Sequence, residues 1–202
     1  GRLGKIVEWS NGSLVWRFKA AAMGVPFIPV RSMLGTDTFK YSSAKLVECP
    51  YTGVPIALVP ALILDVGIIH VHRADQYGNC QIDGISGFAY ELSRASKTLI
   101  VSAEEIIPTA EIRRHPDRTI IPYYLVDAVV HAPYGSHPGE MCYLYERDEP
   151  HIQHWAEVSK TPEATQEYLD TYIYDIEDHQ EYLALIGEER LKYLQDIVPD
   201  RG

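Results

Sequence analysis

The segment from Ile63 to Gly84, ILDVGIIHVHRADQYGNCQIDG, constrains the fold more than any other part of this chain. It opens with an almost unbroken apolar run, rich in β-branched residues, made of Ile63, Leu64, Val66, Ile68, Ile69 and Val71. Such a run is typical of a strand covered on both faces of a parallel sheet. Polar residues follow it, namely His70, His72, Arg73, Asp75, Gln76 and Asn79. Open α/β sheets place their ligand sites at such strand ends, so the segment predicts an α/β enzyme component.

Other segments alternate between strand and helix patterns. Strands are expected at 56–59, 62–71, 98–102 and 126–130, and helices at 13–23 and 87–96, whereas residues 38–53 show no clear periodicity. Strands separated by helices imply an open, mostly parallel sheet with flanking helices. Tight turns are expected at 31–37 and around Gly78.

The region from 161 to 198 predicts two or three C-terminal amphipathic helices. Thr161 and Pro162 are helix-start signals, Asp178 and Glu181 have the spacing of a capping box, and Gly187 can end a helix. The Tyr-rich, acidic composition suits a helical tail that packs on the sheet or on another subunit.

Length, charge and cysteine content restrict the class of protein. A chain of 202 residues with 46% apolar content predicts one domain, residues 1–202. The net charge of −10 lies entirely after residue 145, which argues against binding nucleic acid or an anionic membrane. Three widely spaced cysteines form no metal or disulfide pattern, and neither a signal peptide nor a membrane-spanning run is visible. A cytoplasmic location is expected.

Several segments in order resemble the α subunit of glutaconate CoA-transferase and its relatives among the family I CoA-transferases. They are DVGIIHVHRADQYGN, SAEEI, EIRR, VDAVVHAPYGSHP, WAEVSKTPE and DHQEYLALIGEERLKYL. The likeness is strongest from Asp65 to Val198. Such subunits begin with a βαβ segment and a Gly-rich loop associated with coenzyme A. Gly1–Gly4 and the helix that follows do not match this N-terminal segment. We therefore expect the family's N-terminal segment to be missing from these residues.

The resemblance implies a reaction and a partner. Exchange of CoA between two carboxylic or dicarboxylic acids passes through a glutamyl-CoA thioester, with CoA thioester as cosubstrate and no permanently bound cofactor or metal. In two-subunit transferases the β subunit supplies this Glu, so no catalytic residue is expected in this chain. The related turn here is Val7–Gly12, with Asn11 at the nucleophile position. The predicted substrate-binding residues are Ser10, Asn11, Arg31, Gly35 and Thr36.

Two alternatives remain open for the function. Related hydrolases that open a ring in a steroid-derived CoA thioester carry a catalytic Glu near this turn; Asn11 argues against that activity, whereas Arg31 favours it. A non-catalytic scaffold for the β subunit is the other alternative. The residues themselves also have structural alternatives: a helix start for Ser10 and Asn11, and a surface ion pair for Arg31.

Other polar residues carry weaker hypotheses. His70 and His72 alternate along a strand, so they are expected on opposite faces and not on one metal. His151 and His154 are helically spaced, which we interpret as an exposed face. Glu104 and Glu105 are expected to be structural, and residues 75–79 to close a turn.

Overall fold

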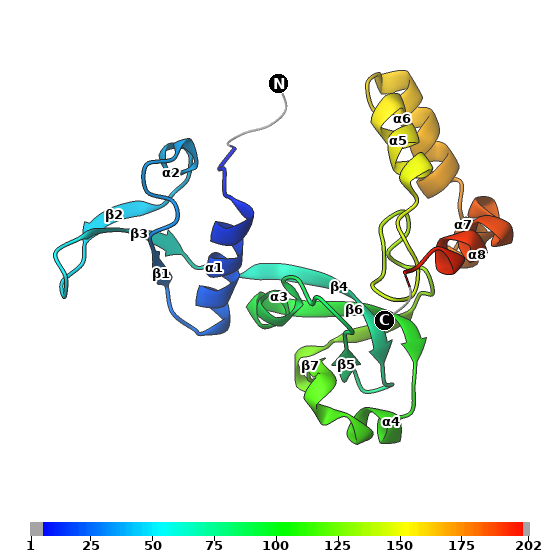
Figure 1. Ribbon diagram of the computed structural model, residues 1–202, viewed down its shortest axis with the longest axis horizontal. Helices are drawn as coiled ribbons and strands as arrows, with labels where there is room; N and C mark the ends of the chain where they lie inside the picture. The colour runs from blue at the N-terminus through cyan, green and yellow to red at the C-terminus, as the bar shows by residue number, and fades with distance from the viewer. Residues whose placement is uncertain (1–5, 200–202) are drawn as a thin grey trace.

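The computed structural model describes residues 6–199, so Gly1–Gly4 lie outside the described residues. It contains two sheets and a helical tail (Figure 1). A small antiparallel sheet has the order β1 (Phe27–Val30), β3 (Pro55–Pro60) and β2 (Lys45–Glu48). A larger sheet in the middle of the molecule has the strand order β7-β5-β4-β6-β8.

The centre of the larger sheet is parallel, as the sequence predicts. The strands β4 (Leu64–Ala74), β6 (Ser96–Ile106) and β8 (Ala128–His131) run parallel to one another. Two short strands, β5 (Cys80–Gln81) and β7 (Thr119–Ile121), extend it in antiparallel fashion. The expectation for residues 56–59 was wrong in one respect: that strand, β3, belongs to the small antiparallel sheet. No helix separates β3 from β4, so no crossover carries β3 into the parallel sheet.

Helix α3 (Ala89–Ala95) precedes β6 and contacts β4, while α4 (Thr109–Arg114), η1 (Pro116–Arg118) and η2 (Tyr123–Leu125) occupy the later connections. The core on the α3 side consists of apolar residues from the strands and α3, namely Ile69, Val71, Ala74, Cys80, Ala89, Leu99, Val101, Ala103 and Ile121. The expectation that β4 is covered on both faces was wrong. Val66 and Ile68 are 53% and 70% exposed, because the described helices cover only the α3 side of the strand at these positions.

The N-terminal region contains helix α1 (Asn11–Ala22), which begins two residues earlier than predicted and packs against α3. The aperiodic stretch 38–53 contains the end of α2 (Asp37–Tyr41) and all of β2. A second hydrophobic cluster fills the space beside the small sheet, with Val30, Met33, Ala57 and Val59 at its centre.

The tail contains α5 (Glu149–Val158), which the sequence interpretation missed, then α6 (Pro162–Leu169), the π-helical η3 (Asp170–Tyr174), α7 (His179–Ile186) and α8 (Glu188–Asp196). Thr161 and Asp178 cap α6 and α7 as predicted. Leu194 of α8 packs with Met141 and Tyr145, so the tail contacts the segment that follows β8.

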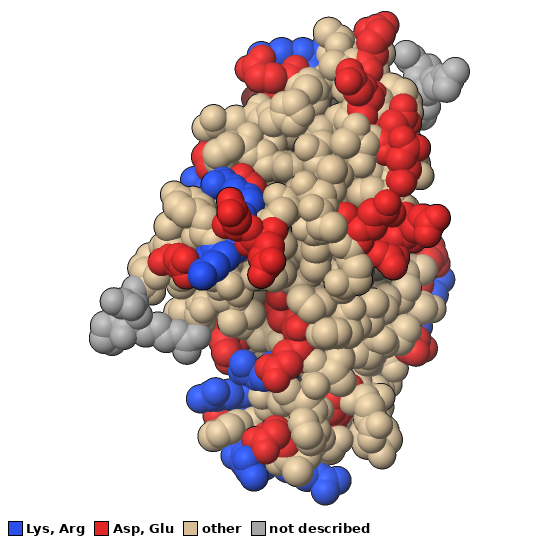
Figure 2. Space-filling model, turned by 90° about the vertical axis from the view of Figure 1, so that its right-hand side faces the viewer, with Lys and Arg blue, Asp and Glu red and all other residues tan. Residues whose placement is uncertain are grey.

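Acidic side chains outnumber basic ones over the upper part of the face that Figure 2 shows. Within residues 6–199, no helix combines the length and apolar character needed to cross a membrane.

Candidate functional site

The predicted substrate-binding residues lie on two neighbouring segments. Ser10 and Asn11 begin α1, and Arg31, Gly35 and Thr36 lie in the loop between β1 and α2. Trp9 packs against the cluster built around Val30 and Met33, which holds the start of α1 beside this loop. The backbone N–H of Glu8 also donates to the carbonyl oxygen of Tyr41, at the end of α2, over 3.4 Å. The structure therefore brings the two segments together.

Ser10 is the N-cap of α1. Its hydroxyl oxygen accepts from the backbone N–H of Ser13 over 3.2 Å. The two hydroxyl oxygens are 2.9 Å apart, and the Ser13 hydroxyl donates its single proton to the Ser10 carbonyl. Ser10 is therefore the donor to Ser13, and its own proton is already used. The helix-capping interpretation of Ser10 is confirmed, while the exposed amide of Asn11 makes no hydrogen bond to residues 6–199.

The loop presents Arg31 as its charged group. Arg31 is exposed and has no ion-pair partner among the described residues, so the predicted surface ion pair is not formed there. Gly35 has a φ of +78°, a left-handed conformation that favours glycine. The Thr36 hydroxyl donates to the Met33 carbonyl over 2.8 Å and accepts from the backbone N–H of Phe39 over 3.3 Å. Gly35 and Thr36 thus shape the loop, and Arg31 supplies a guanidinium suited to a carboxylate or phosphate.

A polar cluster lies at the carboxyl end of the parallel strands. The Ser102 hydroxyl lies 2.8 Å from His70 Nδ1, and His70 Nε2 lies 2.7 Å from a Glu104 oxygen. Glu104 also accepts from the Tyr145 hydroxyl and from the backbone N–H of Tyr134. Burial raises the pKa of Glu104, but the hydrogen bonds from His70, Tyr145 and Tyr134 outweigh it, so its pKa lies below the usual value. The structural role expected for Glu104 is confirmed, because the cluster anchors the segment after β8.

The expectation that His70 and His72 lie on opposite faces of β4 was wrong, because side chains two residues apart in a regular strand point to the same face. His72 has partners of its own. Its Nε2 atom donates to the Cys142 carbonyl over 2.8 Å, and its Nδ1 atom accepts from the backbone N–H of Asp83 over 3.2 Å. These partners fix the tautomer and leave no ring nitrogen for a metal.

Residues 75–79 close a turn, as predicted. Buried Asp75 accepts from the backbone N–H groups of Tyr77 and Asn79 over 3.0 and 2.9 Å. Burial raises the pKa of Asp75, but the hydrogen bonds from Asn79 and its neighbours dominate and lower it.

A buried hub, defined by His137, Asp148, His151 and Arg190, was not found from the sequence. The prediction that His151 lies on an exposed face was wrong, because its ring is half-buried and its Nε2 atom lies 2.7 Å from the Tyr168 hydroxyl. His151 pairs with His137 across the hub, with ring centroids 5.3 Å apart. Its burial among aromatic rings from a later helix could not be read from helical spacing.

The hub brings three potential metal ligands together, with their donor atoms on His137, Asp148 and His151 within 4.8 Å of one another. However, each oxygen of Asp148 already accepts two hydrogen bonds. Oδ1 accepts from the backbone N–H of His151 and from Arg190, and Oδ2 accepts from His137 and from Arg190. Because these four donors saturate the carboxylate, the hub is a structural centre.

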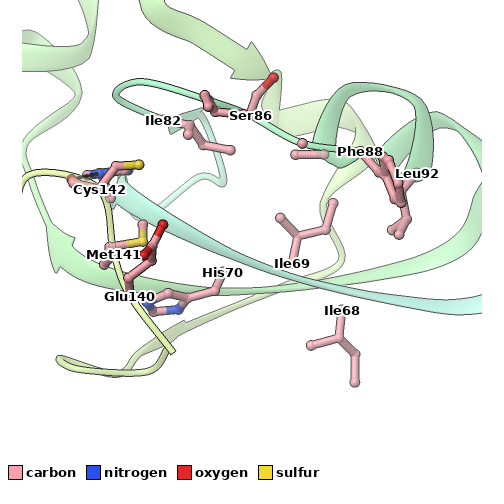
Figure 3. Close-up of a pocket in the computed structure, with 14 residues that line it drawn as sticks. Ile68, Ile69, His70, Ile82, Ser86, Phe88, Leu92, Glu140, Met141 and Cys142 are labelled. Carbon is pink, nitrogen blue, oxygen red and sulfur yellow. Dashed lines mark hydrogen bonds between the residues drawn. The ribbon is translucent and has the colours of Figure 1, made fainter. Parts of the chain in front are cut away.

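A cavity of about 430 Å³ lies beside the edge of β4 (Figure 3). Its lining is mainly apolar, including Ile69, Ile82, Phe88, Leu92 and Met141, with His70 and Glu140 among its polar groups. It lies between β4, α3 and the segment carrying residues 140–142.

The fold is that of an open α/β protein. The guanidinium of Arg31 and the amide of Asn11 are both exposed at the candidate site. The described loop between β1 and α2 contains no buried nucleophile. The coenzyme A transferase family profile matches residues 1–132, and the chain belongs to this family. The A-type subunit of glutaconate CoA-transferase from Acidaminococcus fermentans is 36% identical over 212 residues, which cover 96% of this chain and 66% of that protein. The crystal structure of that enzyme superimposes with a TM-score of 0.88 at 35% identity, covering 95% of this chain and 65% of that chain.

Two further relatives show the breadth of the similarity. An uncharacterized protein of Archaeoglobus fulgidus is 56% identical over 98% of this chain and 44% of its own length. The cholesterol ring-cleaving hydrolase IpdA subunit of Rhodococcus jostii is 32% identical over 91% of this chain and 66% of its own length. The chain thus spans less than two thirds of the length of these relatives. The resemblance inferred from the sequence motifs is confirmed.

Proposed function

We propose that this chain is part of the α subunit of a heteromeric CoA-transferase, which moves CoA between a CoA thioester and a carboxylic or dicarboxylic acid. The nucleophilic Glu belongs to a β subunit. The observation that carries this proposal is the exposed amide of Asn11 at the first position of α1. The resemblance to the family assigns the nucleophile position to this residue, which has no carboxylate. An amide donates hydrogen bonds to an acyl oxygen but does not form a glutamyl thioester.

In this proposal the described residues bind and orient the substrate. Asn11 donates to the acyl oxygen, and Arg31 holds the substrate carboxylate by two parallel hydrogen bonds. Ser10, Gly35 and Thr36 line the site and fix the positions of Asn11 and Arg31 through their caps and turn. CoA thioester is a cosubstrate, and no metal or resident cofactor takes part.

The reaction is a sequence of acyl exchanges on the partner's carboxylate. The carboxylate attacks the thioester carbonyl and expels CoA thiolate, which gives a mixed anhydride. CoA thiolate then attacks the glutamyl carbonyl and releases the first acid, leaving glutamyl-CoA. A second acid reverses these steps and leaves as the new thioester. A cytoplasmic location for the complex stays a prediction.

A second candidate is a CoA-thioester ring-opening hydrolase. The exposed Arg31, which has no ion-pair partner within residues 6–199, favours it, as does the similarity to the ring-cleaving hydrolase subunit. The two activities differ in whether water or a carboxylic acid accepts the acyl group.

The test is a product assay on this chain purified together with its partner. The complex is incubated with an acyl-CoA and an isotopically labelled carboxylic acid, and both labelled thioester and free CoA thiol are measured. Transfer predicts labelled thioester without net release of thiol. Opening of the ring of a cyclic acyl-CoA without any acid acceptor, with no labelled thioester formed when the acceptor is present, would support the hydrolase and reject the transferase.

A further inference from the structure

Arg17 of α1 contacts the tryptophan that precedes the candidate site. Helix α1 lies between the small sheet and α3 and contacts both (Figure 1). The guanidinium carbon of Arg17 is 4.3 Å from the centre of the Trp9 ring, inside the range of about 6 Å for a cation–π contact. Because Trp9 directly precedes Ser10 and Asn11, a contact that holds its ring also restrains the backbone of both residues.

Two hydrogen bonds to the backbone fix Arg17 beside the end of the small sheet. Its Nε–H group donates to the Pro60 carbonyl over 3.0 Å. Its own carbonyl accepts from the Leu62 N–H group over 3.1 Å. Pro60 ends β3, and Leu62 lies in the connection from β3 to β4. Arg17 therefore ties the Trp9 ring to a part of the fold outside the candidate loop.

The charge of Arg17 has no carboxylate partner within residues 6–199. Its side chain is half-buried, and burial lowers the pKa of its guanidinium from the usual value. A half-buried cation without a carboxylate costs stability, so packing alone would favour an apolar side chain of similar length. Local conflicts of this kind are typical of functional positions.

An effect of Arg17 on Asn11 has to pass through Trp9. Six positions separate Arg17 from Asn11, which corresponds to a rise of about 9 Å along the helix axis. Side chains of a helix lean toward its N-terminus, and this lean carries the guanidinium back to the Trp9 ring. The contacts of Arg17 within the described chain include neither Ser10 nor Asn11.

We propose that Arg17 is a positioning residue, which holds the Trp9 ring and thereby fixes the turn that presents Asn11 to the acyl group. The inference rests on the proposed function, in which Asn11 donates to the acyl oxygen. When the cation over the ring is lost, the start of α1 shifts and the amide donor is displaced. A displaced donor stabilises the transition state less, so kcat falls while binding of the CoA thioester changes little.

The experiment is a double-mutant cycle on the complex of this chain with its partner, using Arg17→Met, Trp9→Leu and the double variant. Arg17→Met should lower kcat at least about tenfold and leave KM for the CoA thioester within about twofold. Its Tm should change little, because relief of the half-buried charge offsets the lost hydrogen bond to Pro60. In the Trp9→Leu background Arg17→Met should have no further effect on kcat, since the two residues act as a unit. Arg17→Lys retains a cation over the ring and should recover most of kcat.

Lys19→Met is the matched control. The Lys19 ammonium lies 5.5 Å from the centre of the Trp16 ring, so it makes a similar contact on the same helix. Trp16 is 39% exposed and does not adjoin the turn that carries Asn11. The control should therefore leave kcat, KM and Tm unchanged.

Hydrogen exchange supplies a measurement that does not depend on the reaction. It is recorded on the same complex without substrate, at the amides of Ser13 and Leu14, which donate to the hydroxyl and the carbonyl of Ser10. Arg17→Met should speed exchange at these amides at least about fivefold, because the turn is less restrained. Lys19→Met should not change it.

Wild-type kcat in Arg17→Met, or losses that add in the double variant, would overturn the proposal. Unchanged exchange at Ser13 and Leu14, or equal losses of kcat in Arg17→Met and Lys19→Met, would overturn it as well. If Arg17→Met does not fold, Arg17→Gln removes the same charge and is judged by the same results. A wild-type complex that transfers no CoA would reject the proposed function instead, and exchange alone then decides the role of Arg17.

Discussion

Replacing Asp148 should loosen α5 and α8 from each other and from the segment that carries His137. The Asp148 side chain is 5% exposed and makes two contacts with Arg190, Nε to Oδ2 at 3.0 Å and a terminal nitrogen to Oδ1 at 2.7 Å. It also caps α5 by accepting from the backbone N–H of His151 over 3.1 Å. These contacts join α5 to α8 across 42 positions of sequence.

The magnitude follows from those contacts. Loss of an N-cap costs about 1 kcal/mol, and removing one partner of a buried ion pair costs about 3–5 kcal/mol. Because the Arg190 side chain is 32% exposed, it regains water when Asp148 is removed, and the lower end of that range applies. Asp148→Ala should therefore reduce the free energy of unfolding by about 4 kcal/mol.

The assay is urea unfolding combined with hydrogen exchange of the α5–α8 amides. Asp37→Ala is the matched control, because Asp37 and Lys40 are also 2.7 Å apart but 81% and 71% exposed. The control should cause no measurable change, since exposed pairs contribute little. Equal effects of the two substitutions, or unchanged exchange in the tail of the Asp148 variant, would refute the assignment of the hub as its anchor.

Three other predictions concern separate parts of the molecule. Burial lowers the pKa values of His137 and His151, so below about pH 6.5 the unfolded chain takes up protons that the folded chain does not. Stability should fall as the pH drops from 7 to 5, by up to about 1.4 kcal/mol per pH unit for each histidine, and urea midpoints that stay constant would contradict this. Gly78→Ala should lower the Tm, because a Cβ at a φ of +97° would lie 2.8 Å from Val126 Cβ; an unchanged Tm would show that the turn relaxes freely. Arg31→Lys should lower kcat/KM of the reconstituted complex about tenfold without changing its Tm, because an ammonium lacks the planar two-point contact; wild-type kinetics would place Arg31 outside the site.

Local signals in the sequence predicted local structure well. Thr161, Asp178 and Ser10 each lie next to the N–H groups that they cap, so a few residues of sequence contain the whole interaction. The parallel pairing of β4 with β6 was likewise predictable, because an intervening helical pattern requires a crossover.

Features that depend on distant segments were not predictable in the same way. The apolar run of β4 shows that burial is favourable, but it does not show whether a neighbour is present to cover Ile68. The hub escaped notice because His137, Asp148 and Arg190 meet only after the tail has folded back. Helix α5 was missed although Asp148 and Pro150 are start signals, because the interpretation of the tail began at Thr161.

The location of the covalent intermediate tests the central claim most directly. The complex with its partner is incubated with an acyl-CoA, reduced with borohydride, digested, and mapped by mass spectrometry. We predict a reduced glutamyl residue only on the partner, with every Glu of this chain unmodified. Modification of Glu8, or of any other Glu in this chain, would contradict the proposed division of roles and assign the nucleophile to this chain.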